Sequence, residues 1–338
     1  MPLKSYSVLK GRARAKHAST EGRPHYHVWV NAAGHDYRAT VNVRSMLQPS
    51  EMEYVLKFRF RHPITQELTR LSPGLHRVES QPGGLALDFI RLNLFHRDQM
   101  LALPSSELIS GADLNEVLDG LIGGAMTDPE CWVYVYGEPW AAEASDRFFR
   151  FYPSRGMHDV HMNQGNDPCH LAQDGSWQDG AVLIEHPSQQ RWTALFLKFQ
   201  SQSWQTDEAT GHRRPAGPES PQLAGTNFAA SPEGRVRIIS ALVNPPVGLP
   251  SGESVMLLNP SPVPIELTGW RLTGRAGGTL RLWGILAPGE TRDYPLDGSL
   301  ALGDSGGIIT LLNGDGLKVH GVSYTSEQAA RPGWRLVF

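Results

Sequence analysis

The chain has 338 residues, 40% of them hydrophobic and 19% charged, and a formal net charge of −3 at pH 7, which is the composition of a folded protein long enough for two domains. No window reaches the roughly 20 apolar residues of a membrane helix, and the N-terminus lacks the apolar segment of a signal peptide, so we expect a cytoplasmic protein with no membrane partner. The two cysteines provide neither a disulfide framework nor a CxxC spacing, which argues against a secreted disulfide-rich domain.

Strand patterns dominate the first 206 residues. Runs of β-branched and aromatic residues, bounded by Gly, Asn, Asp or Pro, predict strands at 26–32, 37–45, 131–140, 181–187 and 191–204. Apolar residues at i, i+3 and i+4 predict helices at 87–95 and 113–128, the second with Asp113 as its N-cap. Strands with a few helices indicate an α+β fold for residues 1–206.

A different pattern follows this first part. Residues 207–234 are rich in Pro, Gly, Ser and Ala and lack apolar periodicity, which predicts a linker. Beyond the linker, Pro and Gly turns separate short strand-like runs with no helix between them, at 236–243, 254–259, 265–272, 279–283, 307–313 and 318–324. This pattern predicts an all-β sandwich over residues 235–338.

The most polar part of the chain runs from His158 to Asn166, and a short second motif, WQDG, follows at 177–180. The run places two imidazoles, a carboxylate and three side-chain amides within nine residues, and such groups are costly to bury unless each is paired. Gly156 and Gly165 bracket the run and disfavour a continuous helix, so we expect a loop or strand end, where positioned polar groups usually lie. The run is therefore the first candidate for a functional site.

Histidines and charges are unevenly distributed along the chain. Twelve of the 13 histidines precede residue 216, so we expect any chemistry to belong to the first part. Residues 1–80 carry 13 Lys and Arg against 6 Asp and Glu, whereas residues 81–215 carry 9 against 18. Either the basic segment faces the acidic half of its own domain, or it attracts an anionic partner through exposed cations, which would be Lys10, Arg12, Arg14, Lys16 and Arg23.

Two interpretations of the polar run stay open. In the first, His158 or His161 is a nucleophile or general base, because the ordinary pKa of histidine, about 6.5, lies close to working pH. Asp159 or Asp179 would then fix the tautomer of that imidazole, and amides such as that of Asn163 would donate to a developing oxyanion, as in phosphodiester or acyl hydrolysis. In the second, the run is a polar knot that rigidifies a loop through side-chain to backbone hydrogen bonds.

Three residues outside the run are further candidates. His25 and His27 stand two apart on a predicted strand and so point to one face, where they either join the site or simply pack. Arg91 has two interpretations: it binds a phosphate or carboxylate group of a ligand, or it forms an ion pair with Asp88 on a helix. HxH and HxxH spacings without an HExxH pattern are weak evidence for a metal, so we expect no metal and no other cofactor. No GxGxxG, GxxxxGK[ST] or GxSxG signature is present.

The C-terminal segment resembles the lamin-tail family. The elements that carry the resemblance are ALVNP (241–245), IELTGWRL (265–272), LAPGE (286–290), GGIITLLN (306–313) and VSY (322–324). The resemblance covers nearly all of residues 236–338 and implies an immunoglobulin-like sandwich.

Residues 1–212 are similar to the YukJ family, a bacterial family defined by a domain of unknown function. The matching elements include SYSVLKG (5–11), PHYHVWV (24–30), YRATVNVRS (37–45), LDFIRLNLF (87–95), GMHDVHMNQGN (156–166), WQDG (177–180) and FQSQSWQTDEATGH (199–212). The resemblance implies the architecture of this part of the chain and marks the polar run and WQDG as family motifs.

These observations lead to one hypothesis and one alternative. The hypothesis is a hydrolase that acts on phosphodiesters, a nuclease or phosphodiesterase, with nucleic acid or another anionic molecule as substrate and a protein partner at the C-terminal sandwich. Its catalytic residues would be His158, His161, Asp159, Asp179, Asn163 and His25. Its ligand-binding residues would be Gln164, Asn166, Arg91 and His27. The alternative is a non-enzymatic module that binds a ligand or protein and whose polar run is a structural knot.

Overall fold

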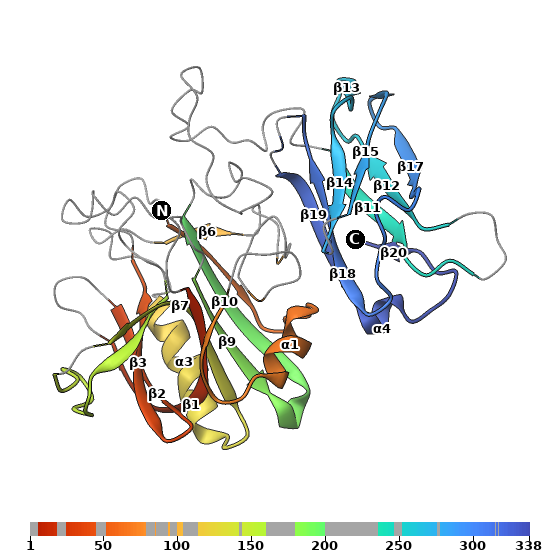
Figure 1. Cartoon of the computed structure of the whole chain (residues 1–338). Coiled ribbons are helices and arrows are strands. Elements are labelled where there is room, and N and C mark those ends of the chain that lie inside the picture. Colours follow the sequence, from red (N-terminus) through yellow and green to blue (C-terminus); the bar gives the residue numbers. More distant parts are fainter. Residues whose placement is uncertain are drawn as a thin grey trace.

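The computed structural model describes residues 6–18, 25–44, 52–78, 85, 94, 100–103, 114–141, 144–159, 180–199, 236–246, 252–275, 278–314, 316 and 318–338. Within these residues the N-terminal part forms one ten-stranded sheet, and the C-terminal part forms two four-stranded sheets and one two-stranded sheet (Figure 1). The chain is therefore strand-rich with few helices. The predicted linker at 207–234 lies outside the described residues, as does nearly all of the helix predicted at 87–95.

In the described residues, the N-terminal part contains the ten strands of the sheet, the helices α1 and α3 and a 3-10 helix. Their bounds in chain order are β1 Ser7–Ala18, β2 His25–Ala32, β3 His35–Asn42, β4 Met52–Lys57, α1 Ile64–Arg70, β5 Gly74–Arg77, β6 Leu101–Ala102, α3 Leu114–Thr127, β7 Trp132–Ala141, β8 Arg155–His158, β9 Gly180–His186, the 3-10 helix Pro187–Gln189 and β10 Arg191–Phe199. All five strands predicted in this part overlap observed strands. The strands β1, β4, β5 and β6 and the helix α1 were not predicted.

Five of the ten strands close into a barrel. The sheet order is β5-β1-β2-β3-β8-β7-β9-β10-β4-β6, and β1 also pairs with β7. Strands β1, β2, β3, β8 and β7 therefore form a ring, in which β3 and β8 are parallel and the other pairs are antiparallel. Strands β9, β10, β4 and β6 extend the sheet beyond β7.

The hairpin of β2 and β3 fixes the register of the barrel. Its two-residue loop is Ala33 and Gly34, with φ of 50° and 82°. Positive φ at both central residues is the geometry of a type I′ turn, whose twist matches that of the flanking strands. Because the side-chain period of a strand is two residues, this turn decides which side chains of β2 and β3 share a face.

Helix α3 packs against the barrel and closes its core. Its buried residues Leu114, Leu118 and Ile122 recur every four residues and form one apolar stripe. They join a core cluster with buried side chains of the barrel strands, among them Leu9, Val28, Val41, Val135 and Met157. The helix predicted at 113–128 is thus confirmed at Leu114–Thr127; Asp113 lies outside the described residues.

Basic residues near the N-terminus interact within the fold. The Lys10 ammonium donates to two backbone carbonyls at the end of α1, and the Arg12 guanidinium lies 3.6 Å from the centroid of the Trp132 ring. Lys16 forms an ion pair of 2.6 Å with Asp119, which belongs to the acidic segment 81–215. These contacts support the interpretation in which the basic segment faces its own domain.

The C-terminal strands are short. Their bounds, with one helix, are β11 Arg237–Leu242, β12 Ser254–Leu258, β13 Ile265–Glu266, β14 Arg271–Gly274, β15 Thr279–Arg281, β16 Ile285–Leu286, β17 Thr291–Pro295, β18 Gly306–Leu312, β19 Lys318–Thr325, α4 Ser326–Ala329 and β20 Leu336–Val337. The sheets have the orders β17-β12-β11-β20, β15-β14-β18-β19 and β13-β16.

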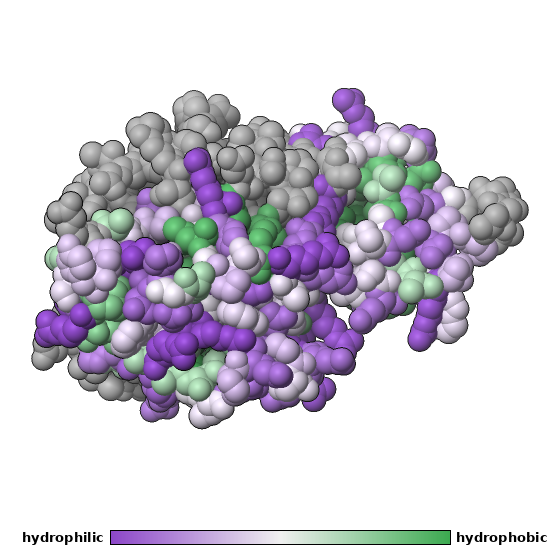
Figure 2. All heavy atoms as spheres, turned by 60° about the horizontal axis from the view of Figure 1, so that its bottom comes forward, coloured by the Kyte–Doolittle hydropathy of each residue, from purple (hydrophilic) through white to green (hydrophobic). Residues whose placement is uncertain are grey.

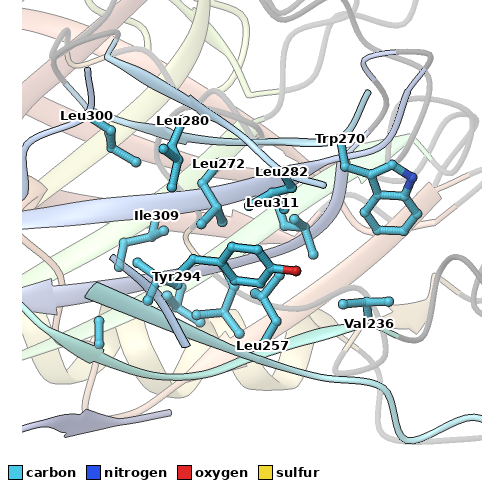
Figure 3. Close-up of a cluster of buried hydrophobic side chains, with 14 of the residues drawn as sticks. Val236, Leu257, Trp270, Leu272, Leu280, Leu282, Tyr294, Leu300, Ile309 and Leu311 are labelled. Atoms are coloured by element: carbon cyan, nitrogen blue, oxygen red, sulfur yellow. The ribbon is translucent and has the colours of Figure 1, made fainter. Parts of the chain in front are cut away.

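One hydrophobic core joins these C-terminal sheets. Leu257 and Tyr294 enter it from the first four-stranded sheet, and Leu272 and Leu311 enter it from the second (Figure 3). Two predictions for this part were wrong in detail. The strand expected at 265–272 is split into β13 and β14 by a turn in which Gly269 has a φ of +85°. The short helix α4, begun by a capping box at Thr325, was not expected.

Helix α1 of the N-terminal part contacts the C-terminal part through two side chains. Glu67 forms an ion pair with Arg275, and the Gln66 amide donates to the Ser326 hydroxyl at 3.1 Å.

In the described parts of the chain we find no helix with the length and apolar character needed to cross a membrane.

Candidate functional site

A row of polar side chains crosses the barrel. Each member of the row pairs with the next one on the neighbouring strand. In order, the members are His17 on β1, His27 on β2, Thr40 on β3, His158 on β8 and Glu138 on β7. Directly paired residues of neighbouring strands point to the same face of a sheet. We call these five residues the histidine row.

A second row lies beside the first. Ala15, Trp29, Arg38, Gly156 and Trp140 are paired in the same way across the same five strands, and we call them the aromatic row. A Cβ at Gly156 would lie 2.0 Å from the Arg38 carbonyl oxygen and 2.4 Å from the Trp140 ring. The absence of a side chain at Gly156 therefore allows the Trp140 indole to cross β8.

Both rows lie on the outside of the barrel. The residues that alternate with them on β2, β3 and β8 are Val28, Ala39 and Met157, and these are fully buried in the core that packs against α3. Because successive side chains of a strand point to opposite faces, the two rows point away from this core.

His25 lies next to the histidine row. It precedes His27 by two residues and shares its face, as expected from the sequence. The His25 and His158 rings meet edge to face, with centroids 5.1 Å apart and an interplanar angle of 86°. The centroid of the His25 ring is 6.1 Å from that of His27, and Nδ1 of His158 is 3.9 Å from Oδ1 of Asp159. The structure thus brings together four of the residues that the sequence nominated: His25, His27, His158 and Asp159.

Asp159 is buried and fixes the end of β8. Its backbone amide donates to the Thr40 carbonyl at 3.0 Å, and its Oδ1 accepts from the backbone amide of Asn42 at 3.1 Å. Both bonds tie β8 to β3 and so position His158, the last residue of β8. A loop or strand end was expected at this point of the sequence.

The connection between β7 and β8 folds over the centre of both rows. We call its described residues, 144–154, the aromatic loop. The Phe148 ring stacks on the His27 ring at 3.9 Å between centroids. The rings of Phe149 and Phe151 lie 5.9 Å and 5.8 Å from that of Trp29. The loop therefore covers His27 and Trp29, whereas His25 and His158 lie beside it and stay partly exposed.

Asp146 holds the aromatic loop in place. Its fully buried carboxylate accepts from the backbone amides of Phe148 and Phe149 at 3.0 Å and 2.9 Å, and from Nε of Arg38 at 2.7 Å. Burial alone would raise the pKa of this carboxyl, but the Phe149 amide and Arg38 outweigh burial and lower it below its ordinary value. Asp146 and Arg38 thus form a buried ion pair between the loop and β3.

His27 is a neutral imidazole in the folded protein. Burial, and next the charge of Arg38, lower its pKa from 6.5 to about 3. Its Nδ1 lies 3.3 Å from the Thr40 hydroxyl. In this position His27 supports the aromatic loop and does not act as a base near neutral pH.

We predict that acid destabilises the protein through His27. Because the pKa of His27 is about 3 in the folded state and near 6.5 in the unfolded state, the unfolded state binds more protons between these pH values. Stability should therefore fall as the pH is lowered from 6.5 towards 3, with a slope from this group of at most about 1.4 kcal/mol per pH unit.

Urea unfolding at neutral pH and at about pH 5 measures this effect. His17 and His25 also face His27, so variants are needed to isolate the contribution of His27 itself. The parent is compared with His27→Gln and with a control, His35→Gln, in which an exposed histidine is replaced. His27→Gln should lose part of the pH dependence and His35→Gln should keep it. An equal loss of stability in all three proteins would show that His27 is not the linked group.

The remaining nominated residues lie outside the described residues. They are His161, Asn163, Gln164, Asn166, Asp179 and Arg91. Among the residues that are described, no group of three or more His, Cys, Asp or Glu side chains is placed so that it could hold a metal ion.

Sequence reasoning missed several residues of this face, among them His17, Arg38, Trp140, Arg147 and Phe148. A signal for Arg38 is present in the sequence, because a two-residue turn at Ala33 and Gly34 places it opposite Trp29. Trp140 and Phe148 reach the face through the pairing of β7 with β8, for which the sequence offers no comparable marker.

Comparison with known proteins supports a family assignment. A family model described as an uncharacterized conserved protein, DUF2278, matches residues 1–211. The chain is also 36% identical to the uncharacterized protein YukJ of Bacillus subtilis (strain 168) over 213 residues, which are 62% of this chain and 93% of the relative. The family match includes every strand of the barrel and ends before β11. The chain therefore belongs to the DUF2278 family of uncharacterized conserved proteins.

Proposed function

We propose that this protein is a binding module that recognises an anionic ligand on the outer face of its barrel, beside the aromatic loop. The observation that carries the proposal is the pair of cross-strand rows, which brings imidazole, guanidinium and indole groups from five strands to one face. Arg147, an exposed residue of the aromatic loop, adds a cation over the Phe148 ring. Positioned cationic groups of this kind attract anions.

Internal bonding favours binding over catalysis. His27 is neutral and covered by Phe148, and Asp146 and Asp159 both accept from backbone amides. Groups held in this way form a rigid surface rather than a reactive set. In the view of Figure 2, hydrophilic residues cover most of the described surface and hydrophobic residues form small, separate patches.

Isothermal titration calorimetry of the full-length chain tests the binding function. The ligands are a single-stranded oligodeoxythymidine, a heparin-derived oligosaccharide and ATP. At least one should bind, and Arg147→Gln should weaken it about fivefold, equivalent to about 1 kcal/mol. Arg281→Gln, which removes an exposed arginine of β15, is the matched control and should bind like the parent. Absence of binding, or binding that Arg147→Gln leaves unchanged, overturns the proposal.

A second candidate is hydrolysis of phosphodiesters. It is favoured by one observation, the contact of His25 with His158 beside the Asp159 carboxylate, because two neighbouring imidazoles could serve as base and acid. The hypothesis adds His161, Asn163 and Asp179 as further catalytic groups. His158→Ala should lower hydrolysis of bis(4-nitrophenyl) phosphate by about 100-fold or more. A parent protein without turnover on this ester and on labelled RNA would rule the candidate out.

For the C-terminal part we propose an immunoglobulin-like, lamin-tail-like sandwich that docks a protein partner, with domains at 1–206 and 235–338 and a linker at 207–234. The separate core around Tyr294 and Leu311 supports this division. Limited proteolysis should cut first within 207–234, and a fragment of residues 235–338 should melt cooperatively. First cuts within 1–199, or a fragment without a melting transition, would contradict the division.

A further inference from the structure

An arginine lies between two aromatic rings on the outer face of the barrel. The Arg38 guanidinium carbon is 4.8 Å from the centroid of the Trp140 ring and 5.1 Å from that of Phe148. The Arg147 guanidinium carbon is 4.6 Å from the centroid of the Phe148 ring. Trp140 and Phe148 are partly exposed and Arg147 is exposed. Aromatic rings and guanidinium planes are the surfaces on which unpaired nucleobases stack.

Carboxylates of the same face are bonded to donors inside the fold. Asp36 accepts from the Trp29 indole and the Asn31 amide, both at 2.8 Å. Asp146 and Asp159 accept from backbone amides, as described above. Glu138, at the end of the histidine row, is partly exposed and pairs with His158. The face therefore presents rings and a cation beside the aromatic loop, while its buried carboxylates, Asp146 and Asp159, are hydrogen-bonded inside the fold.

The topology of the barrel matches that of a known class of ligand-binding barrels, and this face corresponds to their binding face. The order β1-β2-β3-β8-β7, with β3 parallel to β8 and α3 preceding β7, is that of the oligonucleotide- and oligosaccharide-binding barrel. Such barrels bind on the face of their second and third strands and on the loop between their fourth and fifth strands. Here these are β2, β3 and the aromatic loop. Since a fold alone does not determine function, the residues carry the argument and the topology agrees with their position.

We propose that the ligand is a single-stranded nucleic acid whose bases stack on Trp140 and whose phosphates lie near Arg147 and His25. This inference rests on the binding function proposed above and names its ligand. Stacking requires bases that are free of a duplex, so double-stranded nucleic acid binds less tightly. An oligosaccharide would need carboxylates and amides as partners for its hydroxyls, and on this face Asp36, Asp146, Asp159 and Asn31 are engaged internally.

Fluorescence polarisation with the full-length chain tests the proposal. The probe is a fluorescein-labelled oligodeoxythymidine of about 12 nucleotides, with an unlabelled duplex of equal length and a heparin-derived oligosaccharide as competitors. Trp140→Leu should weaken binding of the probe about tenfold, and Trp140→Phe, which keeps a ring, should restore most of the affinity. Arg147→Gln should reduce the slope of log K against log salt by about 0.7. The matched controls are Trp283→Leu and Arg281→Gln, both exposed in the C-terminal part, and they should bind like the parent.

Each result decides the question. Binding of the probe that depends on Trp140 and Arg147, with weak competition by the duplex, supports the proposal. Equal competition by the duplex, or binding that Trp140→Leu and Arg147→Gln leave unchanged, overturns it. Binding of the oligosaccharide through Arg147 without binding of the probe overturns the choice of ligand and leaves the binding function standing. Absence of binding by every ligand overturns both. Since Arg147 is exposed, its variant tests the proposal even if Trp140→Leu does not fold.

Discussion

Replacing Asp146 by Ala should lower the free energy of unfolding by about 3–5 kcal/mol. The carboxylate is fully buried and bonded to Arg38 and to the backbone amides of Phe148 and Phe149. Its removal leaves the Arg38 guanidinium, whose side chain is only 13% exposed, without its carboxylate partner. Loss of one partner of a buried ion pair is costly because the remaining charge is left uncompensated. Urea unfolding of the parent and the variant measures the difference.

Two further variants separate the causes. Asp146→Asn keeps an acceptor for the Phe148 and Phe149 amides and loses the charge, so it should cost less, about 1–3 kcal/mol. Glu130→Ala removes an exposed carboxylate near the start of β7 and should stay within about 0.5 kcal/mol of the parent. If Asp146→Ala is as stable as Glu130→Ala, then Asp146 does not hold the aromatic loop in the way described.

Gly137→Ala should destabilise the protein by about 3 kcal/mol, at the upper end of the cost of overpacking. An added Cβ would lie 1.7 Å from the carbonyl oxygen of His158 and 2.8 Å from the Cα of Asp159. These are backbone atoms of the neighbouring strand and cannot rotate away as a flexible side chain can. The substitution should therefore push β8 away from β7 and displace His158, which thermal or urea unfolding would detect.

The matched control for Gly137→Ala is Gly124→Ala in α3. Nothing lies within 4 Å of a Cβ at Gly124, and alanine is the better helix former. Gly124→Ala should therefore stabilise the protein by about 0.5–1 kcal/mol. Equal effects of the two substitutions would contradict the close approach of β7 and β8.

Much of the fold follows from local sequence patterns. The strands near 26–32 and 181–187 and the helix near 113–128 were predicted because β-branched runs and a four-residue apolar stripe are strong signals. The long strand β1 was missed because small residues, Gly11 and Ala13, take the positions that face the core. At Gly11 a Cβ would lie 2.5 Å from Val30, so the close packing of the barrel requires a residue without an apolar signal.

The closure of the barrel could not be predicted from the sequence. Periodicity identifies strands and their faces, but it does not name the partner of each strand. The pairing of Leu9 with Val135 joins residues that are far apart in the chain, and it turns a sheet into a ring. The rows on the outer face depend on this closure, because Glu138 and Trp140 belong to β7.

The sequence predicted several residues of the candidate site but not how they are arranged. The sequence nominated His25, His27, His158 and Asp159 as polar groups without an obvious structural role, and these residues converge. It assigned a catalytic role to His25 and a ligand-binding role to His27, but it could not predict that His27 is buried, because both carry the same side chain on the same face. Burial beneath Phe148 makes the difference, and that contact depends on the fold of the loop between β7 and β8.

The central claim is that the outer face of the barrel binds the ligand. Histidine ¹³Cε1–¹H NMR of the full-length chain, titrated with the single-stranded oligonucleotide, tests it most directly. The signals of His25 and His158 would be assigned from single His→Gln variants. His186 and His320, buried elsewhere in the fold, are internal controls. The account predicts that the signals of His25 and His158 shift in a saturable way while those of His186 and His320 stay in place. Shifts confined to His186 or His320, or no shift at saturating oligonucleotide, would contradict it.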